Sequence, residues 1–335
     1  PKEPLDDEDI KKLRMIARRT WLYFERFIGP EDHWLPPDHF QEDPKGTVAH
    51  RTSPTNIGLM MLSACSAYDL GYIAILDFIY RMEYTFETLD ELEKYRGHLL
   101  NWYDTVTRET LSPRYVSTVD SGNYAASLIG LSQTLKELPE KNLGYSDLFL
   151  GEIDSLEVFC SVVNSVEQSV IQEIKAELLD HCRDIQREIN EVSIKDSDQM
   201  SLLATLEERI TEPMTRLLKE ILSKDTTINA EVLRDLRHWS NVIFQHIVNM
   251  RSQLNLLAPW METWQKRPEY LKNLKSPQWE KIFNIWIEEK ALQVHLLDIP
   301  ELCIKTLNAL NQLKPIEKNE IFSKLNDSQK TNKAK

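Results

Sequence analysis

The stretch that decides the fold class is SLEVFCSVVNSVEQSVIQEIKAELLDHCRDIQREIN, residues 155–190. Its apolar side chains recur every three or four positions over about nine helical turns, which is the spacing of one face of an α-helix. The stripe consists of Leu156, Phe159, Val163, Val166, Val170, Ile174, Leu178, Cys182, Ile185 and Ile189. A similar stripe covers residues 232–254, and a shorter one covers 202–210. The pattern predicts long antiparallel helices that share these stripes as a core.

Two more helices are predicted near the C-terminus. They cover SPQWEKIFNIWIEEKALQVHLL (276–297) and IPELCIKTLNALNQL (299–313). The last residues, NDSQKTNKAK (326–335), are polar and predict a frayed end.

Glycine is confined to the front of the chain, because all nine glycines lie at or before Gly151. Glycine marks turns, helix ends and close backbone approach, so the front half has elaborate loops and the back half is long helix. The stretch ELPEKNLGYSDL (137–148) contains the last turn signal that combines proline with glycine. We therefore predict one domain over residues 1–150 and a long antiparallel helical bundle over 151–335.

Four helices are predicted in the front half. They run from the acidic residues 6–9 to Ile28, over 54–70, over 73–94 and over 121–136. Ser53 and Pro54 suit the N-cap and first residue of the second helix, and Gly71 suits its C-cap. Asp120 or Ser121 is predicted to cap the fourth helix. No set of alternating strands appears, so the fold class is all-α, with antiparallel helical hairpins.

Composition limits the partners of the chain. Of its 335 residues, 41% are hydrophobic, which suffices for a packed core. The net charge of −13 repels phosphate backbones and anionic lipid, so a neutral partner such as a sugar is admitted more easily than nucleic acid. No apolar run approaches the roughly 20 residues of a membrane helix. We expect a soluble chain, without a signal peptide, that does not itself insert into a membrane.

The four cysteines are Cys65, Cys160, Cys182 and Cys303. They lie far apart in the sequence and form no C-x-x-C motif. This pattern predicts reduced, partly buried thiols in a reducing compartment.

Four polar and aromatic segments are predicted to meet at one end of the front helices. If short turns join antiparallel neighbours, the loop 30–50, the start of the second helix, HLLNWYDT (98–105) and STVDSGN (117–123) share that end. The stacking candidates for a sugar ring are Trp34, Trp102, Tyr103 and Tyr115. The candidates for its hydroxyl groups are Asp38, Arg51, Thr52, Ser53, Asn56, Asn101, Asp104, Asp120, Ser121 and Asn123. Such a mixture of apolar and polar side chains is usual in small-molecule clefts.

Structural roles compete with this interpretation. The serines and Asp120 also suit helix caps, the aromatic side chains also suit a plug at the end of the layer, and Arg51 could pair with Asp120 or Asp104. The loop 33–50 contains metal-ligand residue types without a metal-binding spacing, so neither a metal nor a cofactor is expected. Asp104 and Asp120 are the only carboxylate pair at this end, and the catalytic residues stay unassigned.

The same segments resemble a known family. WLPPDHFQEDPKGTVAHRTSPTNIGL (34–59), RGHLLNWYDTVTRETLSPRYVSTVDSGN (96–123) and LLAPW (256–260) are similar to the middle region of cyclic β-1,2-glucan synthases. The resemblance is strong over about residues 34–137 and loose beyond. It implies a very large bacterial inner-membrane enzyme, in which a membrane region extends a β-1,2-glucan from UDP-glucose. It also implies that a middle (α/α)6-type barrel closes the ring by transglycosylation and that a phosphorylase-like region trims the chain.

Two departures from the family pattern qualify what the resemblance implies. His39 stands where the family has Asn in the PPD-x-FQ segment, which changes the contacts of that loop. The later glycine-rich and aromatic-rich segments of the barrel, which the resemblance associates with catalytic glutamates, do not follow the long helices. The chain is therefore expected to be part of a barrel and inactive alone.

Three hypotheses follow. In the first, the chain supplies one wall of a β-glucan cleft used in chain transfer or cyclisation, with β-1,2-glucan and the rest of the synthase as partners. The parent enzyme would then lie at the cytoplasmic side of the bacterial inner membrane. In the second, the chain is a non-catalytic α-helical interaction module. A third, a stand-alone glycosidase, requires two carboxylates at a retaining or inverting distance.

Overall fold

The computed structural model describes residues 5–141, 146–166, 172–192, 196–224, 229–257 and 295–312. Nine α-helices and six strands of two residues each lie in these ranges, which confirms the all-α class. The chain divides into two compact units, Pro1–Lys136 with Tyr145–Gln253 and Glu137–Gly144 with Leu254–Lys335. No helix in the described ranges combines the length and apolar character needed to cross a membrane. The predicted domain boundary near residue 150 stays a prediction.

The front helices begin and end largely where capping chemistry predicts. The four helices are α1 (Asp7–Phe27), α2 (Pro54–Asp69), α3 (Ile75–Glu91) and α4 (Thr118–Glu137). The Asp6 side chain caps α1, and Ser53 caps α2 by accepting a hydrogen bond from the Asn56 amide at 3.2 Å. Gly71 follows α2 with φ +78°, a left-handed conformation that glycine adopts readily. The third helix is shorter than the predicted 73–94 at both ends.

The predicted cap of α4 is wrong. The helix begins at Thr118, so Asp120 and Ser121 lie inside its first turn. The capping hydroxyl belongs to Ser117, which accepts a hydrogen bond from the Asp120 amide at 3.2 Å. The carboxylate of Asp120 is therefore free for another partner.

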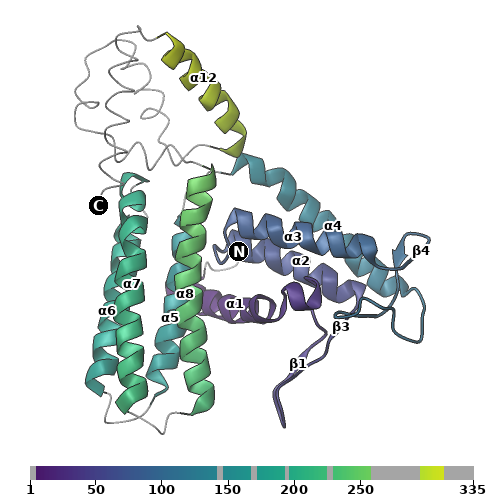
Figure 1. The fold of residues 1–335 in the computed structure, drawn as a ribbon, viewed down its shortest axis with the longest axis horizontal. Helices are drawn as coiled ribbons and strands as arrows, with labels where there is room; N and C mark the ends of the chain where they lie inside the picture. The colour runs from purple at the N-terminus through teal and green to yellow at the C-terminus, as the bar shows by residue number, and fades with distance from the viewer. Residues whose placement is uncertain are drawn as a thin grey trace, which may run out of the picture. The chain divides into compact units, whose positions relative to one another are not determined.

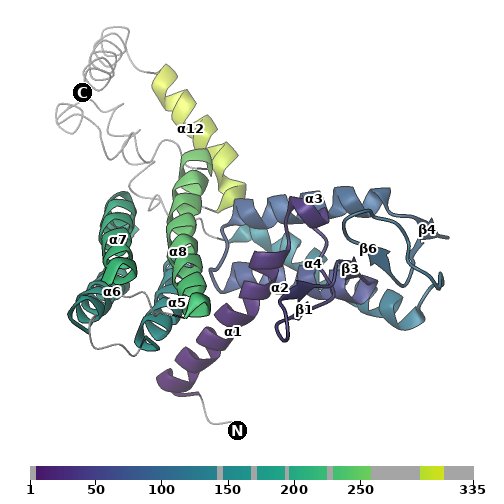
Figure 2. The same ribbon diagram turned by 60° about the horizontal axis from the view of Figure 1, so that its bottom comes forward.

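Short strands tie the loops together. They form three antiparallel pairs, β1 (Phe40–Gln41) with β2 (Thr47–Val48), β3 (Arg51–Thr52) with β6 (Tyr103–Asp104), and β4 (Lys94–Tyr95) with β5 (His98–Leu99). The β3–β6 pair places Arg51 opposite Asp104 and Thr52 opposite Tyr103. It joins the start of α2 to the loop between α3 and α4, as Figure 2 shows.

A second set of contacts fixes the loop that follows α1. The 3₁₀ turn η1 (Pro30–Asp32) ends at Asp32, whose buried carboxylate accepts a hydrogen bond from the Thr105 hydroxyl. The same carboxylate lies 2.7 Å from Nδ1 of His50, and the Thr105 amide donates to the His50 carbonyl at 3.1 Å. These bonds hold the loops 30–50 and 98–117 against one another.

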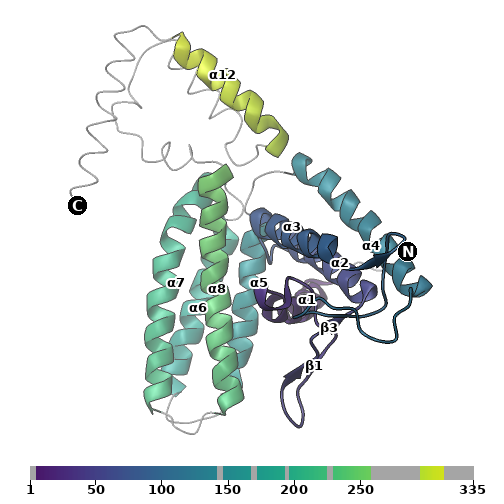
Figure 3. The same cartoon turned by 45° about the vertical axis from the view of Figure 1, so that its right-hand side comes forward.

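The back half forms a bundle of long helices. The helices α5 (Ser146–Asn164), α6 (Gln172–Val192), α7 (Asp196–Lys224) and α8 (Ala230–Leu257) lie side by side in both Figure 1 and Figure 3. The stripe from Leu156 to Ile189 does not belong to one helix: α5 carries it to Val163 and α6 carries it from Ile174, and the two helices pack on each other. Val166 follows α5, and Val170 lies outside the described residues. Phe159, Leu178 and Ile185 of this stripe have no exposed surface, as predicted for a core.

The front helices join the bundle through direct backbone contact. A Cβ atom on Gly71 would lie 1.7 Å from the Asp147 carbonyl oxygen of α5, and a Cβ on Gly151 would lie 1.9 Å from the Gly71 carbonyl oxygen. Only glycine permits this approach, so the turn between α2 and α3 rests on the backbone of α5. Helix α1 also packs on α5.

A buried polar cluster lies in the same region. Arg18 of α1 is 1% exposed, donates to Ser155 of α5 at 2.9 Å and lies 4.8 Å above the ring of Trp239 in α8. Glu152 of α5, which has no exposed surface, lies 2.8 Å from Nδ1 of His246 in α8. The core that holds α1, α5 and α8 together is therefore partly ionic.

The second unit contributes few described elements. These are η2 (Leu138–Glu140), η4 (Leu296–Asp298) and α12 (Ile299–Asn311), and the ring of His295 contacts the Glu140 carbonyl. Helix α12 confirms the prediction over 299–313. The prediction of a helix over 276–297 and that of a frayed tail at 326–335 lie wholly or largely outside the described residues.

Candidate functional site

Polar and aromatic side chains from four segments form one group at the loop end of α2 and α4. We call this group the rim cluster. It consists of Asp38, Arg51, Thr55, Asn56, Trp102, Asp120 and Asn123. Its members come from the loop after α1, from β3 and the first turn of α2, from the loop next to β6, and from the first turns of α4. The predicted meeting of these segments at one end is observed.

Asp38 is the centre of the rim cluster. One carboxylate oxygen accepts hydrogen bonds from Nη2 of Arg51 at 2.9 Å and from Nε at 3.2 Å, and it lies 3.1 Å from Nδ1 of His39. The other oxygen accepts from Nδ2 of Asn56 at 3.2 Å. Burial acts to raise the pKa of Asp38, but the hydrogen bonds from Arg51, Asn56 and His39 outweigh it and lower the pKa. Asp38 is therefore an anion that holds Arg51 in place.

Trp102 carries the aromatic surface of the cluster. The guanidinium carbon of Arg51 lies 4.9 Å from the centre of the Trp102 ring, a cation–π distance. The ring is half-buried and Arg51 is exposed. The Arg51 pairing predicted with Asp104 or Asp120 is wrong, since its ion-pair partner is Asp38.

Thr55 links α2 to α4. Its hydroxyl donates to Asp120 Oδ1 at 2.5 Å and accepts from Nδ2 of Asn123 at 3.1 Å. Thr55 was not among the predicted site residues. It follows Pro54 in the first turn of α2, where the sequence shows a capping signal, but its partners lie 65 and 68 positions along the chain. His39, which contacts Asp38, was also not predicted as a site residue; the sequence marked it as one of the metal-ligand residue types of the loop and as a departure from the family pattern.

Four of the predicted site residues are buried. Thr52 and Tyr103 have no exposed surface, Asn101 is 2% exposed and Ser53 is 4% exposed. Tyr103 donates to the Glu93 carbonyl and accepts from the Leu100 amide, both at 2.7 Å. Burial raises the pKa of its phenol. These buried side chains stabilise the loops, and we assign no ligand contact to them.

The remaining predicted residues have separate roles. Asp104 accepts hydrogen bonds from the amides of Val106 and Thr107 at 2.9 and 2.7 Å, which makes it the cap of a turn. Tyr115 is 51% exposed, and its backbone pairs with Asn101. Ser121 is half-buried in the first turn of α4.

Trp34 packs on α3. Its ring stacks on Tyr84 at 5.2 Å, and its carbonyl accepts from the Thr85 hydroxyl at 3.2 Å. The structure thus gives Trp34 an aromatic partner outside the rim cluster.

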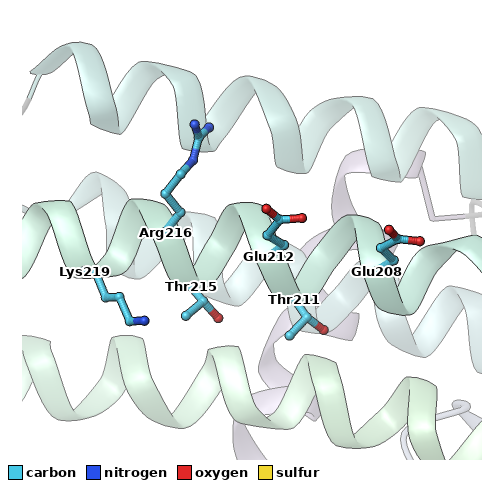
Figure 4. Close-up of a pocket in the computed structure, with 6 residues that line it drawn as sticks. All are labelled: Glu208, Thr211, Glu212, Thr215, Arg216 and Lys219. Carbon is cyan, nitrogen blue, oxygen red and sulfur yellow. The ribbon is translucent and has the colours of Figure 1, made fainter.

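Two cavities lie away from the rim cluster. One, of about 540 Å³, follows the side of α7 and is lined by Glu208, Thr211, Glu212, Thr215, Arg216 and Lys219 (Figure 4). The other, of about 290 Å³, is an apolar groove between α1 and α2. Within the described ranges, no three His, Cys, Asp or Glu side chains come together as a metal site requires.

These observations define an all-α chain whose loop end carries a connected polar and aromatic surface. No protein-family model matches the chain. Over 136 residues the chain is 52% identical to cyclic beta-(1,2)-glucan synthase NdvB of Rhizobium meliloti (strain 1021). The match covers 41% of this chain and 5% of that protein. The chain is therefore related to this synthase over part of its length, and its place within a parent enzyme stays a prediction.

Proposed function

We propose that the chain is part of a cyclic β-1,2-glucan synthase and that the rim cluster supplies one wall of a β-glucan-binding cleft used in chain transfer or cyclisation. The observation that carries this proposal is the continuous series of contacts from Trp102 through Arg51 and Asp38 to Asn56. Thr55, the neighbour of Asn56, extends it to Asp120. The partial identity to the Rhizobium synthase supports the choice of glucan as the ligand.

The chemistry of the rim cluster suits a sugar. Asp38 binds Arg51 through Nε and Nη2 and leaves Nη1 without a hydrogen bond among the described residues, so that nitrogen can donate to a ligand hydroxyl. The half-buried ring of Trp102 and the exposed ring of Tyr115 offer apolar faces for a pyranose. Because Arg51 lies over Trp102, a sugar that stacks on that face must move the guanidinium aside.

The first turn of α4 supplies the second part of the proposed wall. Asp120 uses Oδ1 for Thr55, and its second oxygen can accept from a glucan hydroxyl. Asn123 is exposed beside it. Asp104 caps its own turn and is not assigned a ligand contact. We assign a binding role to Asp120, and an acid–base role to neither carboxylate. The catalytic groups would come from other regions of the parent enzyme, which we place at the cytoplasmic side of the bacterial inner membrane.

Calorimetric titration with linear β-1,2-glucooligosaccharides tests the proposal. We expect Trp102→Ala and Asp38→Ala to weaken binding about tenfold each, since a loss of about 1.4 kcal/mol changes an affinity by that factor. Asp180→Ala is the matched control for the change in charge of Asp38→Ala, because Asp180 is an exposed carboxylate paired with Arg183 on α6. Equal affinities for the wild type and both rim variants would refute the proposed wall.

A second function, an α-helical interaction module, is favoured by one observation. The apolar groove between α1 and α2 is bordered by Leu59 and Leu62, which are 54% and 37% exposed, and α1 adds Ile16 at 62%. Exposed apolar surface of this kind is typical of a contact with another protein segment. This function would be supported over the first if the chain did not bind glucan and if substitution of Leu59 and Ile16 by Glu abolished binding to a protein partner.

A further inference from the structure

Two of the four cysteines meet between α5 and α6. Cys160 lies four residues before the end of α5, and Cys182 lies in the middle of α6. Across the packed helices their side chains interact with each other, although 22 positions separate them in the sequence. The two helices are packed neighbours, and Phe159 and Leu178 beside the thiols have no exposed surface.

The two thiols differ in accessibility. Cys160 is half-buried, so a small solute can reach it, whereas Cys182 has no exposed surface. The remaining cysteines lie elsewhere, Cys65 buried in α2 and Cys303 exposed on α12. The contact therefore pairs one reachable thiol with one protected thiol.

Charges near Cys160 favour its thiolate. The hydrogen bond from Cys182 lowers the pKa of Cys160 most, burial and Glu157 oppose it, and Arg183 and Lys11 lower it further. The interaction with Cys160, and after it burial, raises the pKa of Cys182. Of the two, Cys160 is the better nucleophile, because the thiolate is the reactive form.

We propose that Cys160 and Cys182 form a peroxide-responsive disulfide that links α5 to α6. The Cys160 thiolate attacks hydrogen peroxide, so that an S–O bond forms, the O–O bond breaks and hydroxide leaves. The sulfur of Cys182, after losing its proton, attacks the resulting sulfenic acid. The S–S bond forms, the S–O bond breaks, and the departing hydroxide takes that proton as water. Overall, two thiols lose two electrons and two protons, and one peroxide becomes two waters.

The disulfide would link the last turns of α5 to the middle of α6. Helix α5 carries Gly151, which contacts the Gly71 turn of the front helices, and Glu152, which pairs with His246 of α8. A crosslink that restrains α5 therefore stabilises the whole of this unit. Closing a loop of about 20 residues predicts a rise of about 5–10 °C in the thermal midpoint.

Peptide mapping after peroxide treatment tests the proposal. The full chain with Cys303→Ser is exposed to hydrogen peroxide, alkylated, digested and analysed by mass spectrometry under non-reducing conditions. We expect a linked pair of peptides holding Cys160 and Cys182, lighter by two hydrogen atoms than the reduced pair, with Cys65 recovered as a free thiol. The thermal midpoint should rise, and a reductant should reverse both changes.

Two further variants separate the steps. Cys182→Ala should leave a sulfenic acid on Cys160 that a dimedone probe traps, and Cys160→Ser should leave Cys182 unreacted. Recovery of both cysteines as free thiols, under conditions that oxidise Cys303 in the wild-type chain, would overturn the proposal. A linkage of Cys160 to Cys65 or to a second molecule would overturn it as well. If the Cys182→Ala variant does not fold, the peptide mapping of the Cys303→Ser chain still tests the proposal.

Discussion

The rim cluster and the core of the helical bundle are built from the same kinds of side chain and use them differently. Asp38 and Arg51 pair in the rim cluster with side chains that are 20% and 49% exposed, whereas Glu152 and His246 pair in the core at 0% and 5%. Water screens the first pair and leaves Arg51 able to exchange partners. The second pair is cut off from water, and Glu152 Oε1 and His246 Nε2 are without hydrogen-bond partners in the described residues. An exposed pair can thus exchange one partner for a ligand, whereas a buried pair must keep both partners.

Backbone contact between the α2–α3 turn and α5 predicts the largest effect. Gly71→Ala adds a Cβ 1.7 Å from a carbonyl oxygen of α5 and forces alanine into φ +78°. We expect a loss of about 4 kcal/mol or more in the free energy of unfolding, from overpacking and backbone strain together. Urea denaturation of the full chain measures it.

Gly97→Ala is the matched control for Gly71→Ala. Gly97 also has a positive φ, +85°, but a Cβ there meets nothing within 4 Å. Gly97→Ala should therefore lower the free energy of unfolding only by the cost of backbone strain, about 1–2 kcal/mol. Equal losses in the two variants would show that α5 does not rest on the turn before α3.

The buried pair predicts the next largest effect. Glu152→Ala leaves a cavity and an unpaired His246, and should cost about 3–4 kcal/mol. Glu152→Gln keeps the shape and should cost less than Glu152→Ala. Burial raises the pKa of Glu152 above its ordinary 4.5, despite the opposing effects of His246 and Arg18.

The sign of the pH dependence follows from that raised pKa. The unfolded chain loses the Glu152 proton near pH 4.5, while the folded chain keeps it to a higher pH, so the wild type loses stability relative to Glu152→Gln as the pH rises from 4.5 through the folded pKa. Denaturation of both proteins between pH 4 and about 8 checks this. A difference that stays constant with pH would contradict it.

The contact between α2 and α4 predicts a smaller effect. A Cβ on Gly58 would lie 2.6 Å from Ser127 Oγ and 3.3 Å from the Tyr124 backbone. Gly58→Ala should cost about 1–2 kcal/mol, since overpacking exceeds the gain in helix propensity. Gly122→Ala in α4, where nothing lies within 4 Å, should stabilise the chain by about 0.5–1 kcal/mol. Thermal melts of the two variants should therefore shift in opposite directions.

The surface pair predicts the smallest effect on stability. Asp38→Asn should cost about 1 kcal/mol at pH 7. Because the pKa of Asp38 is lowered from 3.8, its contribution is present above that pH and is lost as the pH falls through the folded value. The difference between the wild type and Asp38→Asn should therefore shrink below pH 3.8. A loss at pH 7 as large as that of Glu152→Ala would contradict the contrast between the two regions.

The sequence predicted what depends on local chemistry. The caps at Ser53 and Gly71, the end of α1 next to Ile28 and the apolar stripes are encoded within one or two turns, and the structure confirms them. The stripe over residues 155–190 keeps its period across the end of α5, so periodicity alone did not reveal that α6 begins there. The partner of Arg51 and the contact between Cys160 and Cys182 depend on the packing of separate segments, which spacing does not determine.

The candidate site shows the same limit. The convergence of the loops followed from antiparallel connection, but the burial of Thr52 and Tyr103 follows from the β3–β6 pair, which no alternating pattern in the sequence predicts. The (α/α)6-type barrel, the domain boundary near 150 and the glucan contacts stay predictions.

The most direct test of the rim cluster is an NMR titration of the full chain with a linear β-1,2-glucooligosaccharide. We predict saturable shifts of the Trp102 indole N–H and of the side-chain amides of Asn56 and Asn123, all lost in Asp38→Ala. Absence of shifts at these groups, or shifts confined to the groove between α1 and α2, would contradict a glucan-binding wall at this end of the molecule.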